Sequence, residues 1–324
     1  PVRPRDHGAG QLTDLPVTEV LADDGEPIAV PLGSRTRSTA RRVTDALLGY
    51  LFLLPALVVF GLFAFFPLGR LVFDSVHRQP RFLNRPPTYQ GFGQLKDTLT
   101  SDQFTSGLTH SAQFMLYSVP LGLVLGVLLA VAAHRRLRGI KVFQAIFSST
   151  VASSVAVASV IFFTLVNPQV GYFKDVSWLS LDQPQSAMFS VALSSVWQNL
   201  GLTFIIVLAA LQAVPEELNE AATLDGFGAV RRFFRITVPL ISPALLFLAI
   251  VLVISALQAY AQIEVLTGGG PAGATETLLF KIADPKGIRP LHERAGLSLG
   301  LFALTGVVAL VQYSLLSRRV HYGD

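Results

Sequence analysis

The sequence of 324 residues contains no cysteine and little charge. Without thiols the chain has no disulfide, no thiolate nucleophile and no cysteine-ligated metal site. Charged residues make up 14% of the chain and apolar residues 51%, whereas soluble domains are roughly 25% charged. No glycine is followed directly by lysine, so the phosphate-binding loop of many nucleotide-hydrolysing proteins is absent. The composition indicates a membrane protein without an ATP site of that kind.

Six segments lack Asp, Glu, Lys and Arg over more than the ~20 residues that cross a bilayer. A transmembrane barrel would instead show ~10-residue segments of alternating hydrophobicity, and none is present. We therefore predict an all-α integral membrane protein with six transmembrane helices. The predicted helices cover 47–68, 110–133, 143–166, 187–211, 240–263 and 296–316.

Lysine and arginine are dense at one set of helix ends, which the positive-inside rule places in the cytoplasm. With six helices, both termini and the polar segment 212–239 lie on this side. Cations on the opposite side are spread over longer loops. The net charge of +4 is thus explained without nucleic-acid binding. The dense positions are Arg35, Arg37, Arg41, Arg42, Arg135, Arg136, Arg138, Lys141, Arg318 and Arg319.

Residues 1–46 mix proline, glycine and acidic residues with little apolar periodicity. Such a segment buries too little apolar surface to fold alone, so we predict a disordered cytoplasmic tail. Its basic end, Arg35–Arg42, is expected to meet the anionic headgroups of membrane lipid. The six-helix transmembrane domain is predicted to cover 47–320.

The segment Glu216–Pro243 is polar, lies between two apolar segments and is patterned as two short helices. Pro215 fits a first helical turn, and Glu216 and Glu217 follow at the positive end of the helix dipole. Gly226 is a natural helix stop, for which we expect a left-handed backbone. A second helix then interleaves three arginines with apolar residues. From these features alone, an amphipathic hairpin on the membrane surface fits as well.

Particular residues in this segment carry more information. Glu220-Ala221-Ala222, with Gly226, Ile236 and Val238-Pro239 at their fixed distances, resembles the EAA signature of ABC importer permeases. Phe227 stands where a small residue is usual, and Val238 where leucine is usual. In that family the loop is the cytoplasmic coupling segment, which docks into the ATP-hydrolysing subunit. The resemblance implies coupling roles for Glu220, Ala221, Ala222, Asp225, Gly226, Arg231, Phe233 and Pro239.

The same resemblance implies an assembly in a bacterial or archaeal plasma membrane. The chain would form half of a translocation pore, completed by a second homologous permease subunit. An ATPase dimer would bind ATP and Mg²⁺, and a solute-binding protein would deliver the solute outside, so this chain itself needs no cofactor. We expect Glu220 to pair with an arginine of the ATPase, and the alternative is a solvated carboxylate.

Four further segments resemble the carbohydrate branch of these permeases, the maltose and glycerol-3-phosphate permease-like family, and the likeness covers 46–320. This implies a type I importer fold and a sugar or oligosaccharide as solute. Glycerol-3-phosphate or a glycerophosphodiester is the alternative. A fixed anion would attract lysine or arginine to the cavity, and the predicted helices contain none, which favours a neutral glycan. The segments are Tyr50–Pro55, Ala209–Leu218, Val265–Pro271 and Thr275–Leu278.

Polar residues in the predicted fourth and fifth helices are candidates for solute contact, because polar groups in a bilayer face a cavity or another helix. The resemblance implies the same helices, since the family binds sugar there. Aromatic and amide side chains suit sugar rings and hydroxyls. A hydrogen bond between helices, worth ~0.6 kcal/mol, explains each residue equally well. Gln258 and Gln262 are one helical turn apart, which favours a shared cavity. The candidates are Trp197, Gln198, Asn199, Ser255, Gln258, Tyr260 and Gln262.

Other motifs have simpler explanations. The string Gly296–Gly300 matches the G-x-S-x-G of hydrolases, but that turn follows a strand. Here it begins a helix, where small residues allow close packing, and Gly122 with Gly126 is a packing motif of the same kind. A secondary transporter would hold carboxylates or cations at mid-membrane, and the predicted helices hold none. We predict no catalytic residue and no metal site.

Overall fold

The structure is a computed structural model. It describes residues 17–21, 27–31, 39–78, 87–134 and 139–317. Its elements fall into two compact units, Pro1–Pro67 and Leu68–Asp324, each with its own internal contacts.

The first unit contains a β-hairpin and a long helix. Strands β1 (Val17–Leu21) and β2 (Pro27–Pro31) pair antiparallel, in agreement with their valine and isoleucine content. Helix α1 (Thr39–Phe60) continues into one π-helical segment, η1 (Gly61–Phe65). The structure therefore differs from the predicted disordered tail in two ways. Strands lie within it, and the helix begins at Thr39 rather than at 47, because the residues between include no glycine or proline.

Four helices are long and apolar enough to cross a membrane, and two bent pairs bring the number to six if each pair is one span. Within the described ranges the helical membrane fold predicted from the charge-free segments is thus confirmed. The long helices are Leu48–Val76, Asp102–Ala133, Pro184–Gln212 and Leu291–Leu315, and the bent pairs are Ile140–Ala152 with Val155–Val166 and Ala229–Leu240 with Ser242–Leu257.

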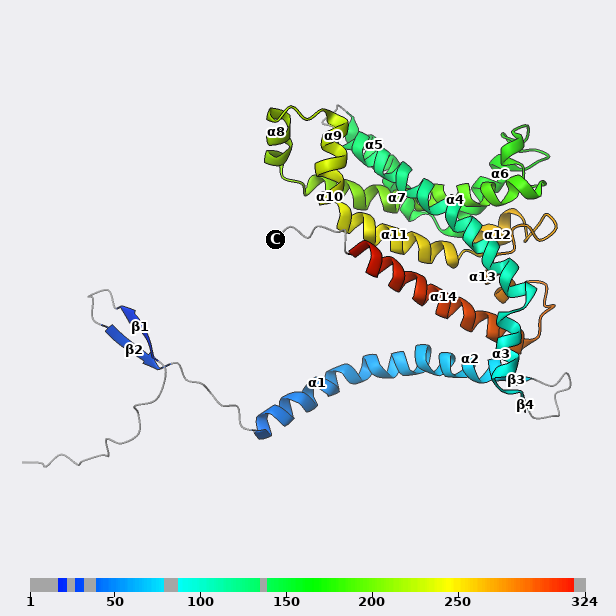
Figure 1. The fold of residues 1–324 in the computed structure, drawn as a ribbon, viewed down its shortest axis with the longest axis horizontal. Coiled ribbons are helices and arrows are strands. Elements are labelled where there is room, and N and C mark those ends of the chain that lie inside the picture. The colour runs from blue at the N-terminus through cyan, green and yellow to red at the C-terminus, as the bar shows by residue number, and fades with distance from the viewer. Residues whose placement is uncertain (1–16, 22–26, 32–38, 79–86, 135–138, 318–324) are drawn as a thin grey trace, which may run out of the picture. The chain divides into compact units, whose positions relative to one another are not determined.

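The second unit holds the end of the first span, the other spans and short elements between them (Figure 1). The strands β3 (His77–Arg78) and β4 (Thr88–Tyr89) form a small antiparallel pair. The helices are α2 (Phe66–Val76), α3 (Gly91–Leu99), α4 (Asp102–Ala133), α5 (Ile140–Ser148), η2 (Ser149–Ala152), α6 (Val155–Val166), η3 (Ser177–Leu179), α7 (Pro184–Gln212), α8 (Glu216–Leu224), α9 (Ala229–Arg232), η4 (Phe233–Thr237), α10 (Val238–Leu240), α11 (Ser242–Leu257), α12 (Ala261–Leu266), α13 (Leu278–Ala283) and α14 (Leu291–Ser317).

The third predicted span, 143–166, is not one straight helix. Helix α5 with the 3₁₀ turn η2 meets α6 at a bend of 109°. The bend falls in a serine-rich run, whose hydroxyl groups compete with the helical backbone for hydrogen bonds. Ser154 Oγ accepts a hydrogen bond from the Val157 N–H at 3.3 Å and so caps α6. The Ser153 hydroxyl donates to the Thr150 carbonyl at 2.8 Å and closes the preceding turn.

The fifth predicted span, 240–263, is also divided. Helix α11 begins after a bend of 71° and ends at Leu257, and α12 continues the chain from Ala261. Pro243 lies in the first turn of α11, where its missing N–H is tolerated but cannot extend the helix before it. At the second break the Thr277 hydroxyl donates to the Ala259 carbonyl at 3.2 Å and pairs a group that the helix leaves free.

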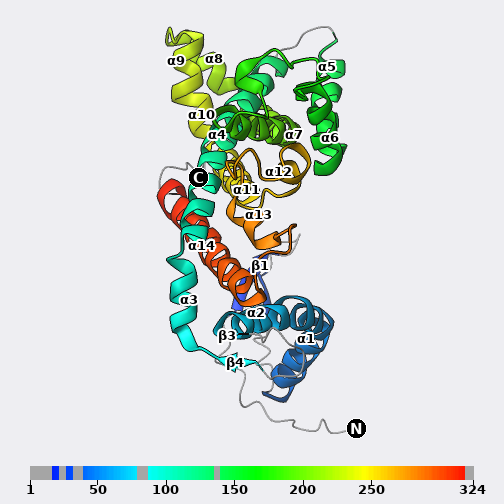
Figure 2. The ribbon, with the colours of Figure 1, turned by 90° about the vertical axis from the view of Figure 1, so that its right-hand side faces the viewer.

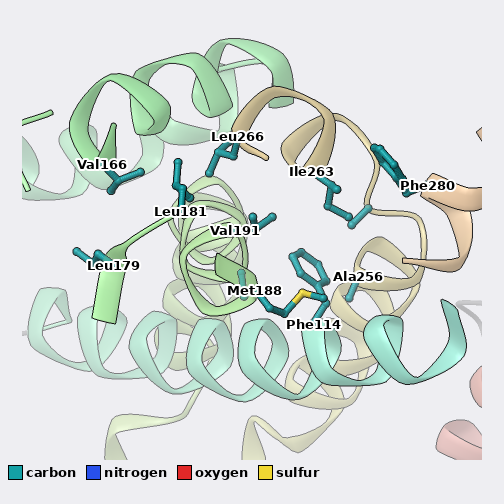
Figure 3. Close-up of a cluster of buried hydrophobic side chains, with 12 residues drawn as sticks. Phe114, Val166, Leu179, Leu181, Met188, Val191, Ala256, Ile263, Leu266 and Phe280 are labelled. Carbon is teal, nitrogen blue, oxygen red and sulfur yellow. The ribbon is translucent and has the colours of Figure 1, made fainter. Parts of the chain in front are cut away.

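Helix α7 lies among the other helices of the second unit, and its contact with α4 is the largest between two helices (Figure 2). One buried cluster joins α7 to α4, α12 and α13 (Figure 3), with Phe114, Met188, Ile263 and Phe280 among its members. A second cluster joins the other end of α7 to α4 and α11. Lipid tails are as apolar as these side chains, so close packing stabilises the contacts more than transfer from water does.

Glycines let the helices approach closely. A Cβ atom added to Gly126 would lie 2.2 Å from Thr203 Cγ2, so α4 meets α7 here through its backbone. Gly296 and Gly300 play the same part where α14 meets α3 and the start of α4, with the nearest atoms at 2.9 and 2.6 Å. The G-x-S-x-G string of α14 therefore serves packing, as expected.

We expect Gly126→Ala to destabilise the protein more than Gly122→Ala does. The added methyl group at Gly126 overlaps Thr203, whereas no atom lies within 4 Å of the same position at Gly122. Overpacking typically costs ~1–3 kcal/mol, which lowers the midpoint of thermal unfolding in detergent. Equal midpoints for the two variants would contradict the close α4–α7 contact.

Candidate functional site

The polar segment predicted to couple to a partner folds into a helical hairpin at one end of the second unit (Figure 1). Helix α8 begins directly after Pro215, which precedes the first turn instead of lying within it. Glu216 and Glu217 occupy that first turn, as predicted. Their carboxylates lie at the positive end of the helix dipole and stabilise the start of the hairpin.

Helix α8 ends in a turn that requires glycine. Gly226 has a φ of +78°, the left-handed backbone that the sequence predicts. The Phe227 N–H donates to the Ala222 carbonyl at 2.9 Å, and the Gly226 N–H donates to the Thr223 carbonyl at 3.1 Å. This pair of bonds is a Schellman motif, which closes α8 and directs the chain into α9.

Side chains hold the second helix of the hairpin, residues 229–240, against the first. Arg232 Nη1 donates a hydrogen bond to Thr223 Oγ1 at 2.8 Å. The guanidinium carbon of Arg231 lies 4.4 Å from the centre of the Phe227 ring, which is a cation–π contact. The sequence pattern predicts a role for Arg231 but not for Thr223 or Phe227, because their contacts exist only once the turn has formed.

The predicted coupling residues differ in exposure. Ala222 is buried, and Phe233 and Pro239 are half-buried. Glu220 forms no hydrogen bond or ion pair with the described part of the chain. Its carboxylate is therefore available to another subunit. The exposed members are Glu220, Ala221, Asp225, Gly226 and Arg231.

A cavity of about 270 Å³ lies where the hairpin meets the ends of α4 and α7. Both polar and apolar side chains line it, so the base of the hairpin is not filled by the subunit itself. The lining residues are Val131, His134, Leu211, Val214, Asn219, Ala229, Arg232, Phe233 and Thr237.

The predicted solute contacts on α7 are only partly accessible. Trp197, Gln198 and Asn199 are all half-buried. Asn199 Nδ2 donates to the Ser195 carbonyl at 2.9 Å, a bond within α7. Asn199 also lines a very small cavity with Ser118, of about 10 Å³. The amide of Asn199 is thus already used within the helix bundle.

The prediction that Gln258 and Gln262 share one face of a helix is wrong. Gln258 follows the last residue of α11, whereas Gln262 belongs to α12, so the spacing of an unbroken helix does not apply. Gln258 is exposed and lines a groove of about 930 Å³ beside α14, whereas Gln262 is buried. Ser255 is exposed, and the ring centre of half-buried Tyr260 lies 5.9 Å from that of Phe280. Within this subunit the candidates are divided between different surfaces.

A buried lysine helps to fix the end of the second unit that lies away from the hairpin. Lys281 of α13 is buried, and its Nζ donates to Ser106 Oγ of α4 at 2.6 Å. Burial lowers the pKa of Lys281, and the carboxylate of Glu276 acts in the opposite direction. The sequence gives no sign of this contact, which joins residues far apart in the chain.

Asp284 follows α13 and closes the same region. Its carboxylate accepts hydrogen bonds from the Arg289 N–H at 2.7 Å and from Arg289 Nη1 at 3.3 Å. Burial alone would raise the pKa of Asp284, but backbone hydrogen bonds from Arg289 and Ile288 and the charges of Arg289 and Arg294 hold it below its usual value. The ionised carboxylate therefore stabilises the fold, and this contribution is lost as the pH falls through the lowered pKa.

Apolar spans with an exposed helical hairpin between the fourth and fifth are the arrangement that the sequence predicts for an importer permease. Residues 122–322 match the family described as binding-protein-dependent transport system inner membrane component. The chain belongs to this family. It is a permease subunit of a binding-protein-dependent importer with the type I fold.

Two curated relatives are similar over nearly their whole length. The chain is 32% identical over 283 residues to the sn-glycerol-3-phosphate transport system permease protein UgpA of Yersinia pestis bv. Antiqua (strain Antiqua), covering 85% of this chain and 96% of the relative. It is 30% identical over 287 residues to the UgpA protein of Rhizobium meliloti (strain 1021), covering 86% and 98%.

A solved structure shares the fold. A chain of the bacterial alginate ABC transporter, crystallised in complex with an alginate pentasaccharide-bound periplasmic protein, matches with a TM-score of 0.72. The sequences are 21% identical, and the match covers 88% of this chain and 99% of that chain.

We expect Gly226→Val to reduce uptake by the assembled importer, because a β-branched residue is strained at a φ of +78°. Gly228→Val is the matched control, since Gly228 has a φ of −64° and no atom near its Cβ position. Uptake rates in membrane vesicles with equal amounts of inserted protein measure the effect. Equal uptake by the two variants would contradict the importance of the left-handed turn.

Proposed function

We propose that this permease subunit forms one half of an ATP-driven translocation pore and is moved through its hairpin. In the proposed assembly a second homologous permease completes the pore, and an ATPase dimer binds the hairpins. A solute-binding protein delivers the solute at the other side. ATP and Mg²⁺ are bound by the ATPase, and this chain binds no cofactor. The observation that carries the proposal is an exposed, internally fixed hairpin whose Glu220 has no partner within the described part of the subunit.

The hairpin suits the transfer of force. Its two helices are joined by the Schellman turn and by the bond from Arg232 to Thr223, so they move as one body. The second helix continues through the 71° bend into α11. When the ATPases close on ATP, the hairpins approach each other, and α11 is re-aimed. Such rigid-body movement is a standard route to alternating access.

The proposed location is the plasma membrane of a bacterium or archaeon, with both termini and the hairpin in the cytoplasm. Helix α4 supports the membrane setting, because one of its faces is apolar and exposed. Leu116, Val124 and Leu128 are 66%, 54% and 58% exposed on that face. We assign this face to contact with lipid or with the second permease.

Glu220→Ala is the direct test of coupling. Loss of one partner of a desolvated charge pair typically costs ~2–5 kcal/mol, so we expect uptake and solute-stimulated ATP hydrolysis to fall sharply while insertion is unchanged. Glu217→Ala, on the same exposed helix, removes only a contact with the helix dipole worth ~0.3–1 kcal/mol, so both rates should fall much less than in Glu220→Ala. Normal uptake by Glu220→Ala in a fully assembled complex would assign the main contact to the apolar side chains of the second helix.

A sugar or oligosaccharide is the proposed solute. The cavities lined by Asn199 and Gln258 contain no charged side chain, and an anionic solute would be expected to need cationic partners. The alternative solute is glycerol-3-phosphate or a glycerophosphodiester. The names of the relatives that are 30–32% identical favour this alternative.

ATP-dependent uptake by the reconstituted importer, with its solute-binding protein present, distinguishes the two solute classes. We expect ATP-dependent uptake of at least one of maltose, maltotriose, cellobiose and raffinose, and no uptake of sn-glycerol-3-phosphate or glycerophosphocholine. Uptake of the phosphate compounds alone would replace the sugar by the alternative. The measurement is accumulation of labelled solute in proteoliposomes, with the transporter lacking the ATPase as control.

A further inference from the structure

A cleft of about 570 Å³ lies where η3 and the start of α7 meet the middle of α4, away from the hairpin. We propose that this cleft is an outer glycan site, which holds an uncharged sugar ring before it reaches the pore. The proposal rests on the carbohydrate import proposed above. The lining residues are Tyr117, Ser177, Trp178, Gln183, Gln185, Ser186 and Phe189.

Three aromatic rings form one wall of the cleft. The ring centre of Phe189 lies 5.7 Å from that of Tyr117 and 5.9 Å from that of Trp178, with interplanar angles of 74° and 60°. Tilted arrangements of this kind are favourable between aromatic rings, so Phe189 holds the other two in place. Trp178 is nevertheless 57% exposed. Its indole thus presents a flat apolar surface, which matches the C–H face of a sugar ring.

Uncharged hydrogen-bonding groups surround these rings. Gln183 and Gln185 are exposed, and each amide can both donate and accept hydrogen bonds. The Tyr117 hydroxyl accepts a hydrogen bond from Gln113 Nε2 at 3.2 Å, which leaves its own O–H free to donate. Sugar hydroxyls also act as both donors and acceptors, so the cleft supplies the groups that they need.

The absence of charge from the lining defines the ligand class. None of the seven lining residues is Asp, Glu, Lys or Arg. Recognition of a phosphate or carboxylate would call for arginine or lysine, so neither glycerol-3-phosphate nor an anionic lipid headgroup fits. Tryptophan is also common where a membrane meets water, but a contact with lipid tails would not need the neighbouring glutamine amides. A neutral sugar uses both the rings and the amides.

The position of the cleft along α7 indicates at which stage of transport a solute would meet it. Phe189 lies five residues after the first residue of α7, which is about 8 Å along the helix. Asn199, a predicted contact within the pore, lies ten residues further on, about 15 Å deeper. With the hairpin in the cytoplasm, a solute released outside reaches the cleft before it reaches Asn199.

Tryptophan fluorescence tests the proposal, because this chain contributes only two tryptophans to the assembled transporter, Trp178 and Trp197, and each can be removed in turn. The assembled transporter is placed in phosphatidylcholine nanodiscs without its solute-binding protein. The sugar of the panel above that the wild type imports fastest is then titrated. We expect a saturable change in emission for the wild type and for Trp197→Phe, and none for Trp178→Phe. Gln185→Ala should raise the Kd about two- to tenfold, as loss of one hydrogen bond does.

Uptake with saturating solute-binding protein supplies the second measurement. Trp178→Ala should lower the rate about three- to tenfold, the range of one aromatic contact. Tyr172→Ala is the matched control, because Tyr172 is an 85% exposed aromatic residue of the same loop and does not line the cleft. It should leave both the Kd and the uptake rate unchanged.

The outcomes separate this proposal from the proposed function. Trp178 anchors the chain to lipid if two results are found together. Trp178→Ala and Tyr172→Ala both lower only the amount of inserted protein and leave the uptake rate per inserted transporter unchanged, and the wild type shows no saturable change in emission. The outer glycan site is then overturned and sugar import stands. If the wild type imports only sn-glycerol-3-phosphate, sugar import fails, and the glycan site fails with it.

Discussion

Inside a bilayer every backbone N–H and C=O group must find a partner within the protein, and this constraint explains where the helices of this permease can break. The chain is not helical between α11 and α12 or between α12 and α13, and side chains pair backbone groups at both breaks. The Thr277 hydroxyl donates to the Ala259 carbonyl at 3.2 Å, and Ser111 Oγ accepts from the Leu278 N–H at 2.9 Å. Ser111 belongs to α4, so a break in one part of the chain depends on the position of another helix.

The exposed hairpin pairs its backbone groups by local means. Its turn is closed by backbone bonds at Gly226, and its two helices are joined by Arg232 and Thr223. None of these bonds requires α4 or α7. The hairpin can therefore keep its shape when it is displaced, which the proposed coupling role requires. In contrast, the irregular segment between α12 and α13 would lose its partners if α4 moved away.

The sequence predicts those features that depend on local pattern. Charge-free length locates the six apolar segments, and the spacing from Glu220 to Pro239 identifies the hairpin and its left-handed glycine. The sequence does not predict features that depend on contacts between residues far apart in the chain. The break after Leu257 follows no proline or glycine, and it separates Gln258 from Gln262. Trp178 belongs to the segment before α7, so only the fold reveals that it shares a cleft with Tyr117 of α4.

The two helices that leave the hairpin are connected to it in different ways. Helix α7 reaches it past a cavity of about 270 Å³, which residues of α4, α7 and the second helix of the hairpin line together. Residues 229–240 instead meet α11 at Ile241, which is 1% exposed and packs in one cluster with Phe204 and Leu248. A packed bend of this kind moves both of its arms together. Displacement of the hairpin therefore reaches α11 through this bend, and it reaches α7 at the same place, because Phe204 belongs to α7.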